Sequence, residues 1–395
     1  MLLQNCRLVG ALSGGVSGES CWVRIDKDRI TGIGTGSAEP VVGEEVFDCG
    51  GKTLLPGLMD IHTHMNGLVG FRPRDVEDPM GLFVNTAGIV RRYLDYGFTT
   101  IRDAGGCLRV NNHIRDAVEQ GLIEGPRVIS CGLILEPPET QIVGNWYPLY
   151  REASGAEEFR AAARRELAET GEFIKIMASG SALQKTGIPT QPIMIEDEIR
   201  ACVEIASLKG TYVAAHAHSS GSIKSCIRAG VRTIEHASFI DDEGIGMLLD
   251  SENCYLVPTY AAFYQNEEAT RGTPYEYLIE KLKSMLHLSV GQIRKVYEAG
   301  VKKMGFGTDS SVGMDQYEQG VEFRYRKELC GMSDLDILMQ ATVYNAEIVG
   351  LEKETGSIRE GLCADLILVD GHPDEDISAM YHKPAAVWAK GKKVR

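Results

Sequence analysis

Residues 56–64 read Pro-Gly-Leu-Met-Asp-Ile-His-Thr-His, an apolar run that ends in two histidines. The apolar part of this run predicts a buried β-strand. His62 and His64 are two positions apart, so both imidazoles point to the same face of an extended strand. Two imidazoles on one face can bind one divalent metal ion, and imidazole suits zinc and several other transition metals. The place of the pair at the end of a strand makes the metal interpretation stronger than an isolated pair would.

Seven more strand-like runs follow, and helical patterns separate most of them. The eight runs are Thr53–His62, Phe98–Asp103, Arg127–Leu133, Phe173–Ala178, Tyr212–His216, Arg232–His236, Tyr255–Thr259 and Lys303–Thr308. The clearest helical patterns are Glu157–Glu169, Ile195–Lys209 and Glu276–Ala299. Eight strands alternating with helices predict an α/β fold, here a (β/α)8 TIM-like barrel. A doubly wound open sheet is the alternative, because short apolar runs can be miscounted.

The two ends of the chain are alike and differ from the middle. Strand-like pieces occur at Leu2–Val9, Cys21–Ile25, Arg29–Gly34, Ala364–Val369 and Ala385–Lys390, with turn residues between them. We therefore expect residues 1–54 and 353–395 to form one small β-sandwich domain from both termini. Residues 55–352 are then expected to form the barrel.

Composition limits the class of protein. The chain has 395 residues, 44% of them hydrophobic, a formal net charge of -14 and no block of Lys and Arg, so nothing in it attracts nucleic acid or an anionic membrane. The 10 cysteines include no Cys-x-x-Cys pair and are expected to be buried free thiols in a reducing compartment. We see no signal peptide and no run of ~20 apolar residues. We expect a cytoplasmic protein that acts on a small molecule, with association into a homo-oligomer left open.

Potential metal ligands occur at five of the eight runs, on what would be one rim of the barrel, where barrel enzymes have their active sites. They are His62 and His64 after the first run, Lys175 in the fourth, His216 and His218 at the fifth, His236 at the sixth and Asp309 after the eighth. We favour His216 over His218 as a ligand of a second metal ion. His218 is then a substrate-binding or supporting residue.

Lys175 and Asp309 indicate the chemistry. A lysine inside an apolar strand should have a depressed pKa, and a neutral amine can add carbon dioxide to become a carbamate that bridges two metals. The alternative is a lysine that extends to the rim of the barrel. The Asp309 carboxylate can bind one metal and take a proton from a metal-bound water, although the residue also suits a simple turn.

The loops supply candidates for binding the substrate. Arginines after the first strand can pair with a substrate carboxylate, and Arg102 is expected to form an internal ion pair with Asp103 instead. Aromatic residues after the third strand could form a lid; these are Trp146, Tyr147 and Tyr150. The candidate substrate-binding residues are Arg72, Arg74, His218 and Tyr260.

These motifs, in this order, resemble the amidohydrolase superfamily over nearly the whole chain. The match includes residues 56–64, Ile174-Lys175-Ile176, Ile234-Glu235-His236, Gly307-Thr308-Asp309 and the tail 356–366. The resemblance is to the binuclear subtype with a carboxylated lysine. It implies two divalent metal ions, expected to be zinc, with His62, His64 and Asp309 on one ion and His216 and His236 on the other. Carboxylated Lys175 and a hydroxide would bridge the two ions, and Asp309 would act as general base and then general acid.

Within the superfamily the chain is most similar to the branch of Xaa-Pro dipeptidases and N-acyl amino acid hydrolases. That similarity implies cleavage of an amide bond in a dipeptide, an N-acyl amino acid or a related carboxylate-bearing molecule. The chain departs from the branch at His218, where a tyrosine is common, and at residues 133–140. Three alternatives remain open: a hydrolase of cyclic amides such as lactams or hydantoins, a mononuclear deaminase, and a barrel scaffold without activity.

Overall fold

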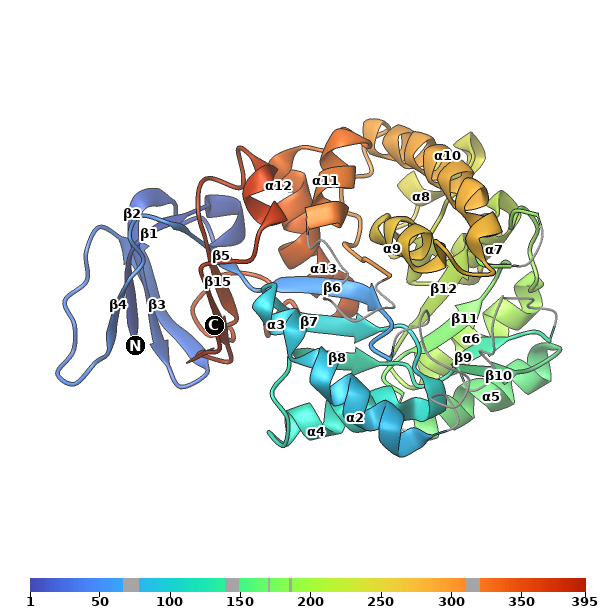
Figure 1. Ribbon diagram of the computed structural model, residues 1–395, viewed down its shortest axis with the longest axis horizontal. Helices are drawn as coiled ribbons and strands as arrows, with labels where there is room; N and C mark the ends of the chain where they lie inside the picture. The colour runs from blue at the N-terminus through green and yellow to red at the C-terminus, as the bar shows by residue number, and fades with distance from the viewer. Residues whose placement is uncertain (67–77, 139–148, 170, 185–186, 310–319) are drawn as a thin grey trace.

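The computed structural model describes residues 1–66, 78–138, 149–169, 171–184, 187–309 and 320–395. Figure 1 shows two regions: a sheet that contains both chain ends, and a larger region of strands surrounded by helices. The larger region alternates strands with helices along the chain. The α/β class expected from the sequence is confirmed.

Both ends of the chain contribute strands to one eight-stranded sheet. Its order is β17-β16-β15-β5-β1-β2-β3, and β4 also pairs with β1. The strands are β1 (Leu2–Leu8), β2 (Gly18–Asp26), β3 (Arg29–Thr35), β4 (Val46–Asp48), β5 (Thr53–Pro56), β15 (Leu366–Val369), β16 (Ala386–Ala389) and β17 (Lys392–Lys393). Strand β5 crosses the predicted boundary between residues 54 and 55. The division into a sandwich domain and a barrel domain stays a prediction.

The strands of the larger region are parallel and form two sheets. The three-stranded sheet contains β6 (Leu58–Thr63), β7 (Phe98–Asp103) and β8 (Arg127–Ser130). The six-stranded sheet contains, in its order, β10 (Tyr150–Glu152), β9 (Ile134–Glu136), β11 (Ile174–Met177), β12 (Val213–Ala217), β13 (Thr233–His236) and β14 (Tyr255–Val257). Parallel pairing places the C-terminal ends of neighbouring strands at one edge, which is where the predicted ligands lie.

The eighth predicted run, residues 303–308, is not a β-strand in the structure. It nevertheless lies between β14 and β6, since Gly305 N donates to Leu256 O at 2.8 Å and Ile61 N donates to Phe306 O at 3.0 Å. Glycine is required here: a Cβ at Gly307 would lie 2.7 Å from both the His62 Cβ and a methyl carbon of Val257. The segment thus connects the two sheets on one side, and closure of a complete barrel stays a prediction.

Helices follow the parallel strands and cover their outer face (Figure 1). Their ends are fixed locally: Ser219 caps α7 by accepting a hydrogen bond from Ser222 N, and Gly230 ends α7 in the left-handed region, with φ 85°. The helices are α2 (Pro79–Val90), α3 (Arg92–Asp95), α4 (Val110–Glu119), α5 (Ala156–Ala168), α6 (Glu196–Leu208), α7 (Ser220–Ala229), α8 (Asp242–Leu249), α9 (Ala261–Thr270), α10 (Ile279–Glu298), α11 (Gly320–Glu328), α12 (Asp334–Met339) and α13 (Asn345–Val349).

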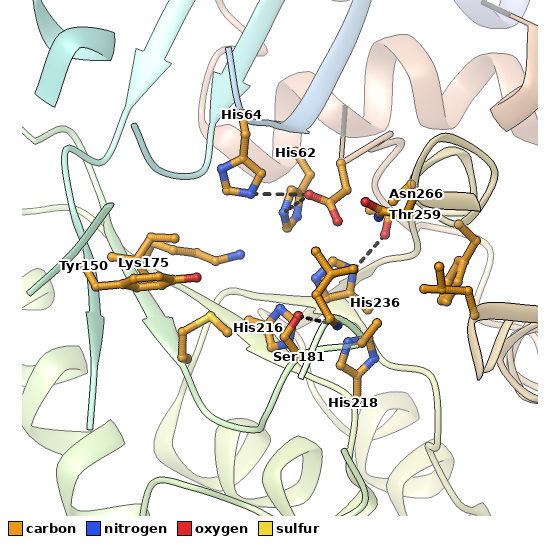
Figure 2. A pocket seen from close by; sticks show the side chains of 18 residues that line it. His62, His64, Tyr150, Lys175, Ser181, His216, His218, His236, Thr259 and Asn266 are labelled. Carbon is orange, nitrogen blue, oxygen red and sulfur yellow. Dashed lines mark hydrogen bonds and ion pairs between the residues drawn. The ribbon is translucent and has the colours of Figure 1, made fainter. Parts of the chain in front are cut away.

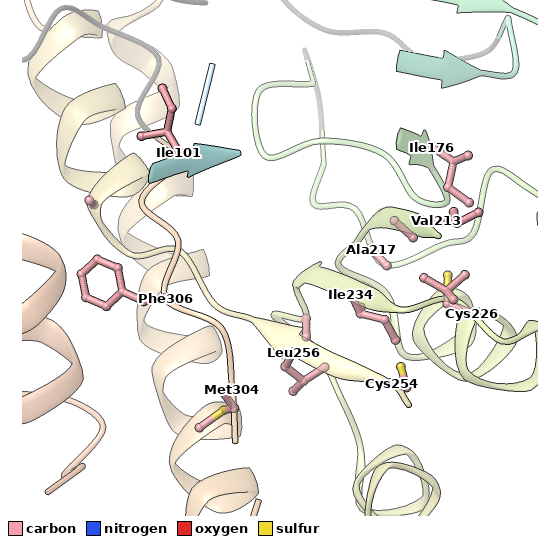
Figure 3. Packing of buried hydrophobic residues seen from close by; sticks show 14 of the residues in the cluster. Ile101, Ile176, Val213, Ala217, Cys226, Ile234, Cys254, Leu256, Met304 and Phe306 are labelled. Atoms are coloured by element: carbon pink, nitrogen blue, oxygen red, sulfur yellow. The ribbon is translucent and has the colours of Figure 1, made fainter. Parts of the chain in front are cut away.

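The main hydrophobic core lies between the parallel strands and these helices. Ile101, Ile176, Ile234, Leu256 and Phe306 are fully buried in it (Figure 3). A second cluster, which includes Trp388, forms the core of the terminal sheet. The apolar runs identified in the sequence therefore form the rigid frame on which the polar strand ends are held.

The cysteines are buried, as predicted. All ten are free thiols with buried side chains. Among the helices of the described ranges, none is long and apolar enough to cross a membrane. The predicted cytoplasmic location stays a prediction.

Candidate active site

The candidate ligands converge at the C-terminal ends of the parallel strands. His62 lies in β6, Lys175 in β11, His216 in β12 and His236 at the end of β13. Figure 2 shows these side chains around one cavity, with the Lys175 amine directed toward the space between the imidazoles. The convergence follows from parallel pairing: β11 pairs with β12 and β12 pairs with β13, in register.

The first group of donors joins His62 and His64 to Asp309. Asp309 Oδ1 lies 3.5 Å from His62 Nε2 and 3.3 Å from His64 Nε2. The other ring nitrogen of His64, Nδ1, donates to Gly105 O at 2.9 Å, and Nδ1 of His62 lies 2.5 Å from Glu235 Oε2. With Nδ1 held in this way, Nε2 of each ring faces Asp309 and has a lone pair when the ring is neutral. Such a group suits zinc.

The second group consists of His216, His218 and His236. Each offers a ring nitrogen within 4.8 Å of those of the other two. His218 is therefore as well placed as His216 to be a metal ligand. Its predicted role in binding substrate stays a prediction. Each ring is held by one hydrogen bond: His236 Nδ1 to Thr259 Oγ1 at 2.7 Å, His218 Nδ1 to Ser238 Oγ at 2.8 Å, and His216 Nε2 to Gly180 O at 3.1 Å.

Burial keeps most of these imidazoles neutral. It is the main reason why the pKa of His62 falls to about 4 and that of His218 to about 3, and it lowers the pKa values of His216 and His236 as well. His64 differs, because its contact with Asp309 outweighs burial and raises its pKa. Neutral imidazoles can donate their lone pairs to a metal ion at neutral pH.

Lys175 brings a buried amine to the same cavity. Its side chain is 1% exposed, and its Nζ has no hydrogen-bond partner within the described part of the chain. Burial lowers the pKa of the amine, and nearby Glu235 and Asp309 oppose that shift. Burying an amine without a hydrogen-bond partner costs free energy. We therefore expect a molecule or ion bound in the cavity to interact with Lys175 Nζ.

Two of the candidate ligands have unusual backbone geometry. His236 has φ 69° and Asp309 has φ 53°, both in the left-handed region that residues other than glycine rarely adopt. Such conformations are costly and concentrate at functional sites. The next residue, Ala237, also has a positive φ of 48°, and its N donates to Ala217 O at 3.1 Å at the end of β12.

A buried ion pair supports the first group. Arg102 donates to Glu235 Oε1 at 2.9 Å and to Ile61 O at 2.6 Å, and both charged side chains are fully buried. The internal ion pair expected for Arg102 is therefore present, but its partner is Glu235 and the predicted partner Asp103 is wrong. Asp103 instead accepts hydrogen bonds from Met65 N and Gly105 N.

The other residues predicted to bind substrate differ in whether they line the cavity. His218 and Tyr150 line the cavity. Tyr260 does not: its side chain is fully buried, and its hydroxyl accepts a hydrogen bond from the Cys330 thiol at 3.2 Å. The chain turns into α9 at this residue, and the ring packs in the main core. A role for Tyr260 in binding substrate stays a prediction. Arg72, Arg74, Trp146 and Tyr147 lie outside the described residues.

Sequence reasoning missed the residues that hold the imidazoles. Glu235, Thr259 and Ser238 each bond to a ring nitrogen of a histidine from another strand or loop. The available signal for Glu235 was an acidic residue within an apolar strand beside His236. For the two hydroxyl residues there was no signal, because their partners are distant in the sequence.

An α/β fold whose parallel strands end in imidazole and carboxylate side chains is one in which hydrolases commonly hold divalent metal ions. The model of the amidohydrolase family matches residues 53–394, and the chain belongs to that family. The superfamily assignment made from the sequence is confirmed.

Named relatives are consistent with this membership. Ochratoxinase from Aspergillus niger is 27% identical over 374 residues, which cover 86% of this chain and 75% of the relative. The structure of a prolidase complexed with N-methylphosphonate-L-proline has a TM-score of 0.88 at 31% identity, covering 100% of this chain and 99% of that one. The structure of a Xaa-Pro dipeptidase with methionine bound in the active site has a TM-score of 0.87 at 28% identity, with the same coverage. With the family, these relatives show that the chain is a hydrolase.

Proposed function

We propose that this hydrolase is binuclear and cleaves the amide bond of a dipeptide, an N-acyl amino acid or a similar carboxylate-bearing small molecule. Support comes first from Lys175, whose buried amine has no hydrogen-bond partner in the described structure and points between two groups of side chains that could hold metal ions. A mononuclear site would leave this amine without a function. The hydrolase relatives whose names state a peptide substrate support the choice of an amide.

His62, His64 and Asp309 would hold one ion, and His216 and His236 the other. Lys175 would ligate both after its neutral amine adds carbon dioxide, a step that forms the Nζ–C bond, releases one proton and leaves an anionic carbamate. When bound, a pair of divalent ions, which we expect to be zinc, would supply Lewis acidity toward a water molecule and the substrate carbonyl.

Asp309 is the residue suited to move a proton. Burial opposes ionisation of its carboxyl, but His62 and His64 outweigh burial and lower its pKa. The carboxylate can therefore accept a proton from the attacking water at neutral pH and release it to the leaving nitrogen. Asp309 N donates to His62 O at 2.7 Å, which fixes the backbone that carries the carboxylate.

Elemental analysis of protein purified from zinc-supplemented cells tests the proposal, followed by assays on N-acyl amino acids, dipeptides, lactams and hydantoins. About two metal ions per chain and turnover of linear amides are expected. Turnover confined to lactams or hydantoins would show that the enzyme acts on cyclic amides and would overturn the proposal of a linear substrate. About one metal ion per chain, together with ammonia release from aminated heterocycles, would overturn the binuclear proposal in favour of a deaminase.

A further inference from the structure

One wall of the cavity is apolar. We name it the α9–α10 wall; it consists of Ala182, Leu183, Ala262, Phe263 and Leu282. Ala182 and Leu183 follow β11, whereas Ala262 and Phe263 begin α9 and Leu282 lies on α10. Three separate elements thus bring apolar side chains to one side of a cavity whose other side carries imidazoles and a carboxylate.

The wall has its own hydrophobic cluster. Phe263 and Leu282 pack with Leu278 and Met285 in a cluster separate from the main core, and Ala182 and Leu183 pack against it. Leu282 is 1% exposed and Phe263 is 7% exposed, so the wall is firmly supported from behind. A supported apolar surface that faces a cavity is the usual form of a binding pocket for an apolar group.

The polar content of this side is small. Among the described residues that line the cavity, Ser181, Thr259 and Asn266 are polar and uncharged (Figure 2). Asn266 is 8% exposed, and its Oδ1 has no hydrogen-bond partner in the described part of the chain. A buried acceptor without a partner, in a residue that lines a cavity, indicates a position that a bound molecule completes.

We infer that the α9–α10 wall binds an apolar group adjacent to the scissile amide, so that the enzyme selects amides that carry a hydrophobic side chain or acyl chain. This inference rests on the proposed amide hydrolysis and names the substrate class within it. An aliphatic or aromatic group gains by leaving water against Phe263 and Leu282. A charged group would lose its hydration there without a partner, and a hydrogen atom, as in glycine, would leave the space unfilled.

The test compares kcat/KM of the metal-loaded enzyme for N-acetylglycine, N-acetyl-leucine, N-acetyl-lysine and N-octanoylglycine. We expect the leucine or the octanoyl compound to exceed N-acetylglycine by roughly tenfold or more, and N-acetyl-lysine to be poor. If N-acetyl-leucine has the higher kcat/KM, the wall binds the amino acid side chain. If N-octanoylglycine has the higher kcat/KM, the wall binds the acyl chain.

Variants of α10 link the preference to the wall. Leu282→Ala should reduce the ratio of kcat/KM for the apolar substrate to kcat/KM for N-acetylglycine by roughly tenfold. Leu282→Met conserves volume and should keep the preference, which shows that the helix tolerates substitution. Leu288→Ala is the matched control, because Leu288 lies on the same helix with 42% of its side chain exposed.

The possible failures are distinguishable. Turnover of amides without a preference for apolar groups, or equal effects of Leu282→Ala and Leu288→Ala, would overturn the inference and leave amide hydrolysis standing. Lack of turnover of every amide by enzyme with both metals bound would overturn the proposed function and the inference with it.

Discussion

Nδ1 of His62 lies 2.5 Å from Oε2 of Glu235, and both side chains are buried. Burial alone would raise the pKa of Glu235, but Arg102 and His62 outweigh burial and lower it well below its ordinary value. Glu235 therefore stays ionised and holds the His62 ring with Nε2 toward Asp309. Carboxylates that hold a ligating imidazole in this way orient the ring and raise its basicity.

The contact between His62 and Glu235 predicts that Glu235→Gln weakens metal binding. The amide keeps the shape of the side chain but removes the charge that Arg102 and His62 both contact. We expect the affinity for the metal nearest His62 to fall by about 10- to 100-fold. Competition with a chromophoric chelator measures that affinity directly.

A control separates this effect from loss of stability, because Arg102 would lose its buried counter-ion. Glu166 is also a buried carboxylate, and its Oε1 lies 2.8 Å from Arg109 Nη2. Neither residue of this pair lines the cavity. Glu166→Gln should lower the free energy of unfolding and leave the metal affinity unchanged. Equal metal affinities in both variants and the wild type would contradict a role for Glu235 in holding His62.

Lys175→Ala should remove most of the bound metal. The variant loses the only amine in the described lining of the cavity that can become a bridging carbamate. Short carboxylic acids added to the variant should restore part of the metal content, because their carboxylate can occupy the vacated position. Elemental analysis with and without propionate checks this result. Lys224→Ala, a change at a lysine paired with Asp241 on the surface, should have no effect. Normal metal content in Lys175→Ala would exclude a bridging role.

Asp309→Asn should separate metal binding from turnover. The amide can still offer one oxygen ligand, so part of the metal should remain, but it cannot take up a proton. Turnover should fall by about 10²- to 10⁴-fold. Steady-state rates normalised to measured metal content test this expectation. A rate near that of the wild type would show that another group moves the proton.

The sequence places the candidate ligands on one rim because their positions depend on local rules, and the structure brings them together there. Alternation along a strand and the common end of parallel strands bring His62, His216 and His236 together without knowledge of the distant packing. The partner of Arg102 depends on tertiary structure. Adjacent residues on a strand point to opposite faces, so Arg102 cannot readily pair with Asp103, and it reaches across to Glu235 on β13 instead.

Other differences between expectation and structure have similar causes. Residues 303–308 have the composition of a strand, but Gly305 and Gly307 approach β6 and β14 so closely that the segment bonds to both without forming a regular ladder. Tyr260 lies at the start of α9, and the direction of a side chain at a strand-to-helix turn is set by the turn. Periodicity contains no information about either feature.

The last prediction concerns pH and Lys281 on α10. This half-buried lysine donates from Nζ to Gln184 O at 2.7 Å, and burial lowers its pKa to about 8 from the ordinary value of 10.5. Between these two values the unfolded chain binds a proton at this position that the folded chain has released. The contribution of Lys281 to the free energy of unfolding should therefore rise with pH across the window from about 8 to 10.5.

Urea unfolding of the wild type and Lys281→Met at several pH values measures this contribution as a difference, so that other titrating groups cancel. The wild type should gain stability relative to the variant as the pH rises through the window. Lys281→Arg is the control for charge: a guanidinium stays protonated throughout, so the difference between Lys281→Arg and Lys281→Met should not change with pH. Parallel curves for wild type and Lys281→Met would show that the Lys281 amine is as well solvated in the folded chain as in the unfolded one.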